Sequence, residues 1–103
     1  MKNNDIFDNL KRIDRLVHEP ARIAILSLLL VVEEADFVFL MNKSGLSQGN
    51  LSSHISKLEG EGLVEIEKKF KGKRPQTILR ITGVGEERLR DYIDTMKNFL
   101  NNF

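Results

Sequence analysis

The sequence has no cysteine, and this absence excludes disulfide bonds, thiolate metal sites, cysteine nucleophiles and thiol redox sensing. Long apolar runs are also missing. The longest one, residues 23–32, contains Ser27 and is much shorter than the ~20 residues that cross a bilayer. The first five residues have no adjoining apolar segment and no small-residue cleavage site, unlike a secretory signal. We therefore expect a cytoplasmic protein with no membrane partner.

A charge excess of one sign is lacking as well. The chain has 16 Lys and Arg residues against 15 Asp and Glu residues, which gives a formal net charge of +1. Any affinity for nucleic acid must therefore come from local clusters of basic residues. The 103 residues are 41% hydrophobic and 30% charged, and the chain has no repeat or Gly/Ser-rich linker. We expect a single folded domain over residues 1–103.

The 3.6-residue apolar period predicts four helices in the first part of the chain. They cover about residues 5–17, 20–34, 37–45 and 47–59. Pro20 suits the first turn of the second helix, whose apolar residues are those of a central core helix: Ala24, Ile25, Leu28, Leu29 and Val32. Ser47 is a good N-cap for the fourth helix, and Gly60 and Gly62 end it.

Beyond residue 62 the apolar period changes from 3.6 to 2, which predicts an amphipathic strand. Its expected inner side consists of Val64, Ile66, Lys68 and Phe70. Residues 71–75 are a basic turn and residues 76–81 a returning strand, so that residues 63–81 form a β-hairpin. Thr82 can cap a last helix over residues 83–102, although Gly85 stands where a capping box would place Glu.

Two helices joined by a short turn and followed by a hairpin predict a helix-turn-helix over residues 37–59 with a wing over residues 63–81. The stretches GLSQGNLSSHISKLEGEGLV (45–64), HEPARI (18–23) and KRPQT (73–77) resemble small bacterial and archaeal winged-helix regulators of the MarR- and ArsR-like kind, over roughly residues 15–95. The resemblance implies a dimeric repressor or activator whose fourth helix enters the major groove. The expected fold is mainly α (α+β), a winged helix-turn-helix with a β-hairpin wing and additional terminal dimerisation helices.

The fourth helix carries a face of small polar residues opposite its apolar stripe of Leu51, Ile55 and Leu58. This outer face consists of Gly49, Asn50, Ser52, Ser53, Ser56 and Lys57. Small side chains let a helix approach base edges closely, and the amides of Gln48 and Asn50 match the donor and acceptor of adenine. An ordinary solvated helix face is the alternative interpretation.

Five basic residues and no acidic residue occupy positions 68–74, whereas acidic residues gather in the last helix. A basic wing binds phosphates and releases counterions. The alternative is a solubilising loop that protects an edge strand. The residues predicted to contact double-stranded DNA are Ser47, Gln48, Gly49, Asn50, Ser52, Ser53, His54, Lys57, Lys71, Lys73, Arg74 and Gln76.

The first and last helices have apolar stripes that one small domain is not expected to cover in full, which predicts a homodimer. The alternative is that both helices fold back on their own core. The predicted dimer interface consists of Ile6, Phe7, Leu10, Ile13, Leu89, Tyr92, Ile93, Met96, Phe99, Leu100 and Phe103. Two-fold symmetry would place two recognition helices ~34 Å apart, one turn of DNA.

No catalytic or metal constellation is evident, so that we expect neither an enzyme nor a cofactor. His18 and His54 have no third ligand grouped with them. We expect His54 to pack against a helix or contact phosphate, His18 to serve a turn, and Arg22 to form an ion pair with nearby acids. The sequence predicts a DNA-binding transcriptional regulator; the alternative is a winged-helix protein-interaction module that does not bind DNA.

Overall fold

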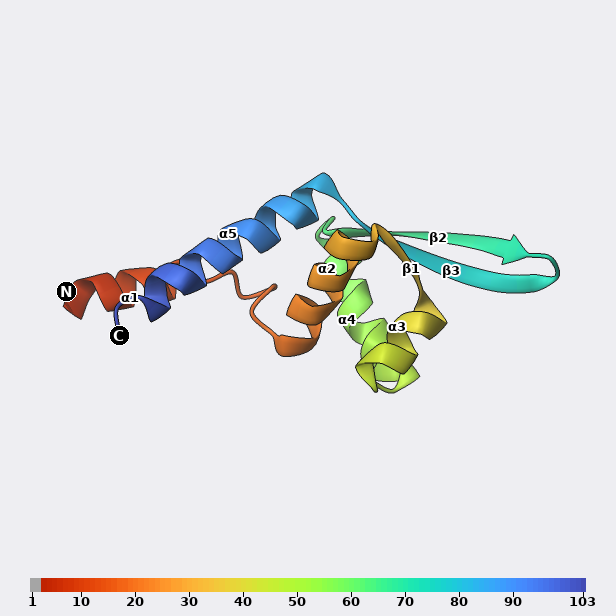
Figure 1. Ribbon diagram of the computed structural model, residues 1–103, viewed down its shortest axis with the longest axis horizontal. Coiled ribbons are helices and arrows are strands. Elements are labelled where there is room, and N and C mark those ends of the chain that lie inside the picture. Colours follow the sequence, from red (N-terminus) through yellow and green to blue (C-terminus); the bar gives the residue numbers. More distant parts are fainter. Residues whose placement is uncertain (1–2) are drawn as a thin grey trace.

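The computed structural model describes the backbone of residues 3–103 and the side chains from Ile6 onward. It confirms the predicted winged-helix fold (Figure 1). The elements are α1 (Asn3–Arg12), α2 (Pro20–Val32), β1 (Glu34–Asp36), α3 (Phe37–Ser44), α4 (Gln48–Gly60), β2 (Val64–Lys71), β3 (Arg74–Ile81) and α5 (Gly83–Leu100).

The three strands form one antiparallel sheet in the order β1-β3-β2. Strands β2 and β3 pair along their whole length, from Val64 opposite Ile81 to Lys71 opposite Arg74. The connecting turn has a positive φ of 65° at Gly72, and a glycine with positive φ at the first central position is typical of a type II′ hairpin. We refer to this hairpin, β2 and β3 together, as the wing.

The core lies between α2, α4, the base of the wing and α5. Its fully buried side chains are Val17, Leu26, Leu29, Leu51, Leu58, Leu63, Leu79 and Leu89. The predicted stripe of α4 is confirmed, because Leu51, Ile55 and Leu58 are at most 3% exposed. For two residues of α2 the expectation of a core position is wrong: Ala24 is exposed, and so is Val32.

The predicted caps of α4 and α5 are confirmed. Ser47 Oγ accepts a hydrogen bond of 3.1 Å from Asn50 N–H, and Thr82 Oγ1 accepts one of 2.9 Å from Gly85 N–H. Such caps satisfy N–H groups that the helix itself leaves without an acceptor. The starts of both helices are therefore fixed by their own sequence.

Gly85 occupies a position where α5 crosses the backbone of Leu63. A Cβ atom built on Gly85 would collide with the Leu63 carbonyl oxygen and would lie 2.9 Å from Cγ1 of Ile81. This close approach leaves room only for glycine. It explains why the glutamate of a capping box is absent here.

Two local expectations are wrong, and one strand was missed. The first helix ends at Arg12 instead of continuing to Val17, because Asp14 Oδ1 accepts hydrogen bonds from the N–H groups of Leu16 and Val17 at 3.1 and 3.3 Å and turns the chain. Strand β1 was not expected at all. Phe70 is not on a covered inner side but is 73% exposed, since the wing extends past the core.

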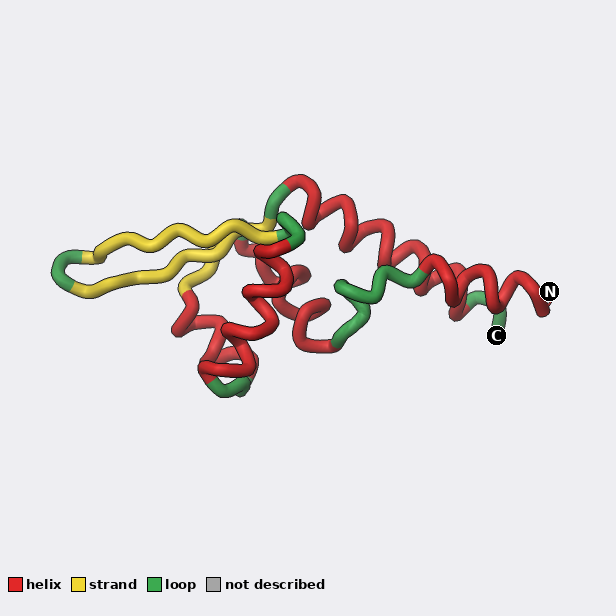
Figure 2. The backbone as a smooth tube through the Cα atoms, turned by 180° about the vertical axis from the view of Figure 1, so that it is seen from behind, coloured by secondary structure: helices red, strands yellow, loops and turns green. Residues whose placement is uncertain are grey.

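The molecule is elongated, with extents of 60 × 25 × 22 Å. The wing projects at one end, and α1 and α5 lie side by side at the other, where Asn3 and Phe103 are also found (Figures 1 and 2). We call α1 and α5 the terminal helices. Within residues 3–103 no helix is long and apolar enough to span a bilayer.

Candidate nucleic-acid interface

The outer face of α4 is open to solvent. All of its predicted contact residues except His54 are exposed: Ser47, Gln48, Gly49, Asn50, Ser52, Ser53 and Lys57. Figure 1 shows α3 and α4 on one side of the sheet, with the wing projecting beyond them. The side chains on this face are short, apart from Gln48, Asn50 and Lys57, so that another surface can approach the helix backbone closely.

The N-terminus of α4 offers donors to an anion. The N–H of Asn50 is bonded to Ser47 Oγ and the N–H of Leu51 to Ser47 O. Helix geometry leaves the N–H groups of Gln48 and Gly49 without an intrahelical acceptor. Together with the helix dipole, they favour a phosphate at this end of the helix.

His54 belongs to the packing of α4 and not to its open face. Arg22 Nε donates a hydrogen bond of 3.3 Å to His54 Nδ1, and Glu19 Oε2 lies 3.6 Å from the same nitrogen. Packing is one of the two roles predicted for His54. The ion pair predicted for Arg22 is also present, since its Nε lies 3.9 Å from Glu19 Oε2.

A cleft of about 320 Å³ separates α4 from the wing. It is lined by Phe37, Gln48, Ser52, Ile55, Ser56, Ile66, Lys68 and Thr77. Lys68 and Thr77 stand on the paired positions of β2 and β3 and were not among the predicted contacts. The signal for Lys68 was available, because the two-residue period places it on the same side of β2 as Ile66, which faces this cleft.

The tip of the wing carries exposed cations. Lys71, Lys73 and Arg74 are all exposed, and within the described part of the chain no carboxylate lies within ion-pairing distance of them. Near the base of the wing, by contrast, Arg80 pairs with Glu34 at 2.7 Å and Glu67 at 2.9 Å. Arg80 thus offsets part of the acidic charge near the base of the wing, while the tip stays positive.

Gln76 faces inward more than expected. It is half-buried, and its amide lies beside the carboxylate of Asp36, the N-cap of α3. Partial burial favours the neutral acid, but hydrogen bonding by the Gln76 side chain and by the N–H of Val38 outweighs it and lowers the pKa of Asp36. Gln76 therefore ties the wing to α3 as well as bordering the basic tip.

The apolar stripes of the terminal helices divide into two groups. Leu89 and Tyr92 are 0% and 7% exposed and belong to the core of the chain itself, while Ile6, Ile13, Met96 and Phe99 are half-buried. The exposed group consists of Phe7 (62%), Leu10 (53%), Ile93 (36%), Leu100 (60%) and Phe103 (84%). The chain therefore covers part of the predicted interface with its own core and leaves these five residues open to solvent.

His18 has a contact that sequence reasoning missed. Its Nδ1 lies 2.7 Å from Tyr92 Oη, and the two rings are 5.7 Å apart. This contact joins the segment before α2 to the middle of α5. No sequence signal links two residues that are 74 positions apart. Among the described residues there is no group of three or more His, Asp or Glu side chains that could hold a metal ion.

Comparisons with known proteins agree with this geometry. A family model described as a winged helix DNA-binding domain matches residues 21–100. An uncharacterised protein of Methanocaldococcus jannaschii is 37% identical over 79 residues, which cover 77% of this chain and 86% of that protein. A transcriptional regulator homologue from Pyrococcus horikoshii OT3 has a TM-score of 0.86 at 32% identity, over 92% of this chain and 96% of that chain.

A more distant structure shares the fold. A mutant of MarR from E. coli in which one cysteine is replaced by serine, solved with operator DNA, has a TM-score of 0.62 at 18% identity, over 97% of this chain and 80% of that chain. These matches confirm the resemblance to winged-helix regulators of bacteria and archaea.

Proposed function

Since this chain belongs to the family of winged helix DNA-binding domains, we propose that it is a transcriptional regulator that binds duplex DNA as a homodimer and catalyses no reaction. The observation that carries the proposal is the exposed polar face of α4 beside a wing whose basic tip is unpaired among the described residues. A major groove about 12 Å wide admits such a helix.

In this proposal α4 reads the bases. Gln48 and Asn50 near its N-terminus can each donate to and accept from adenine, and the serines at positions 52 and 53 allow close approach. Lys57, one turn beyond, reaches a phosphate or a base edge. The N–H groups at the start of α4 hold a backbone phosphate and fix the register of the helix on the duplex.

The wing supplies affinity that does not depend on sequence. Lys71, Lys73 and Arg74 stand at the tip of the hairpin, at a distance from the nearest ion-paired carboxylates. Cations in this arrangement neutralise phosphates and release counterions. We add Lys68 and Thr77 to the predicted contacts. Both line the cleft between α4 and the wing and would face the same stretch of DNA backbone.

The terminal helices hold the dimer. Phe7 and Leu10 on α1, together with Leu100 and Phe103 at the end of the chain, leave more than half of their surface exposed. A second copy would remove this apolar surface from water, at a gain of about 25 cal/mol per Å². Because the wing lies at the opposite end of the molecule, this interface keeps both recognition helices accessible.

The DNA proposal is tested by titrating the protein with duplexes selected from a random pool and with unselected duplexes. Asn50→Ala plus Ser53→Ala should weaken binding to selected duplexes by about 1–3 kcal/mol while binding to unselected ones is kept. Lys73→Ala plus Arg74→Ala should weaken both and reduce the salt slope by about 2.

The matched control, Arg90→Ala plus Lys97→Ala, also removes two positive charges, but it removes them from α5. It should change neither binding mode, because these residues lie away from α4 and the wing. Equal losses in all three variants would mean that only net charge matters. A wild-type protein that no duplex retains at low salt would instead favour the interaction-module function.

Self-association is tested by sedimentation equilibrium of Leu100→Asp plus Phe103→Asp. Both residues are exposed in the protomer, so that the fold should survive and the mass should fall from dimer to monomer. Phe70→Asp, an equally exposed aromatic at the wing, is the control and should stay dimeric. A wild-type monomer, or a double variant that remains dimeric, would remove this interface.

A further inference from the structure

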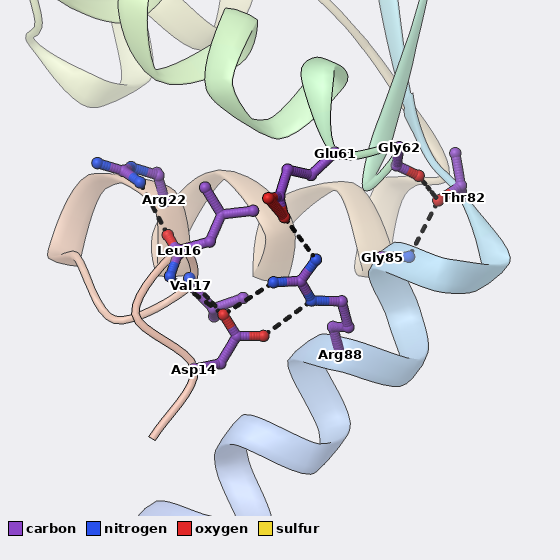
Figure 3. A network of polar contacts seen from close by, with 9 residues as sticks. All are labelled: Asp14, Leu16, Val17, Arg22, Glu61, Gly62, Thr82, Gly85 and Arg88. Atoms are coloured by element: carbon purple, nitrogen blue, oxygen red, sulfur yellow. Dashed lines mark hydrogen bonds and ion pairs between the residues drawn. The ribbon is translucent and has the colours of Figure 1, made fainter. Parts of the chain in front are cut away.

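Arg88 on α5 contacts two other segments at once. Its Nε and one terminal nitrogen donate to the two carboxylate oxygens of Asp14 at 2.8 and 3.0 Å. Its other terminal nitrogen donates to Glu61 Oε2 at 3.0 Å (Figure 3). Asp14 lies in the segment between α1 and α2, residues 13–19, which we call the linker. Glu61 is the residue that caps the C-terminus of α4.

The linker is fixed to α4 at a second point. Arg22 donates to the carbonyl of Leu16 at 2.9 Å and to His54 of α4 at 3.3 Å. Asp14 also holds the linker itself, through the N–H groups of Leu16 and Val17. The helix that we propose to read DNA is thus attached to the linker near its middle, through Arg22, and at its end, through Arg88.

The two halves of the Arg88 contact differ in strength. The side chain of Asp14 is 20% exposed and is bound bidentately, and the hydrogen bond from Arg88 is the largest cause that lowers the pKa of Asp14. Glu61 is 56% exposed and is bound through one nitrogen. Because a guanidinium is planar and rigid, the bond to Asp14 fixes the direction from which Arg88 meets Glu61.

We propose that Arg88 is a positioning residue: it sets the angle between α4 and the terminal helices, and through that angle the spacing of the two DNA half-sites that the dimer accepts. The inference rests on the proposed function. The 13 residues of α4 span about 20 Å at 1.5 Å per residue. A rotation of about 10° at one end therefore moves the other end by about 3.5 Å, close to the rise of one base pair.

The same helices are also joined independently of this contact. The end of α4 is joined to the start of α5 by Thr82, whose Oγ1 donates to the carbonyl of Gly62 at 2.6 Å (Figure 3). The same Oγ1 donates to the carbonyl of Leu63 at 3.1 Å. Leu63 is itself fully buried. The Thr82 bonds and the core hold the two helices together, and Arg88 restricts their relative rotation.

The test uses the duplex that the wild-type protein selects from a random pool. A series of duplexes then changes the distance between its half-sites in steps of a single base pair. Glu61→Ala releases α4 only and alters an exposed side chain, so that folding is not at risk. Arg88→Met removes the contacts with both Asp14 and Glu61. Arg88→Lys keeps the positive charge but lacks the planar guanidinium that binds Asp14 through two nitrogens. Arg90→Ala is the matched control, since Arg90 pairs with Glu86 of its own helix.

We expect the wild type and Arg90→Ala to prefer one spacing. In Glu61→Ala and Arg88→Met this preference should weaken by about three- to fivefold, the range of a single ion pair, with Arg88→Lys in between. Affinity for an isolated half-site and the dimer mass should not change.

The inference is overturned if Glu61→Ala keeps the wild-type spacing profile, or if the variants lose affinity equally at every spacing, as a merely structural role would require. If Arg88→Met does not fold, Glu61→Ala decides alone. Failure of the proposed function is a separate result, because the wild-type protein would then select no duplex.

Discussion

Gly85→Ala tests the close crossing of α5 over the chain between α4 and the wing. The added methyl group would collide with the carbonyl oxygen of Leu63 and would lie 2.9 Å from Cγ1 of Ile81. The carbonyl cannot move aside easily, because it accepts hydrogen bonds from the N–H and the hydroxyl of Thr82 at 3.0 and 3.1 Å. The first turn of α5 must shift instead.

The magnitude follows from three contributions. Overpacking of a closed site costs about 1–3 kcal/mol, and each of the two Thr82 hydrogen bonds that the shift weakens is worth about 1 kcal/mol. The higher helix propensity of alanine stabilises the variant by about 1 kcal/mol. We therefore expect Gly85→Ala to lower the free energy of unfolding by about 2–4 kcal/mol.

The assay is urea denaturation at a fixed protomer concentration, because the proposed dimerisation would make apparent stability depend on concentration. Gly83→Ala is the matched control. It changes the same helix two residues earlier, where a Cβ meets no atom within 4 Å, and should be neutral or stabilising by up to about 1 kcal/mol. If both variants are equally stable, the proposed crowding at Gly85 is refuted.

Three further predictions concern single contacts. The hydrogen bond from Arg88 lowers the pKa of Asp14 from its ordinary value of 3.8. The ionised carboxylate therefore stabilises the fold above pH 3.8, and this stabilisation is lost as the pH falls through the lowered pKa. Asp14→Asn should remove this part of the acid dependence in thermal melts. Tyr92→Phe loses the 2.7 Å contact with His18 and should cost about 1 kcal/mol in urea, whereas an unchanged midpoint would mean that the contact is not formed. Gly72→Val forces a β-branched residue to φ 65° and should reduce amide protection in the wing but not in the core, which hydrogen exchange will measure.

The helices and the hairpin could be predicted because their signals are local. The apolar period of α4 and the caps Ser47 and Thr82 depend on residues within a few positions of each other, and the structure confirms them. The switch to a two-residue period likewise located β2. Each of these features follows from the chain's own geometry.

Other features depend on distant partners and leave no local trace. Strand β1 is three residues long and exists because Ala35 pairs with Leu79. Phe70 has the right phase for an inner position but no core above it. In the sequence, Arg88 is one of several charged residues in an amphipathic helix, and nothing marks it as different. Only the fold brings it into contact with Asp14 and Glu61.

Both ends of the described chain lie beside the terminal helices, at the end of the molecule opposite the wing. In the proposed dimer, joined at this end, the C-terminus of one copy would lie near the N-terminus of the other. Two copies encoded in tandem, with a short Gly/Ser linker, should therefore form the dimer within a single polypeptide, where the second copy is present at an effective concentration of about 1 mM. Such a chain would keep two recognition helices at dilutions at which separate protomers dissociate, and it would allow one half to be mutated alone.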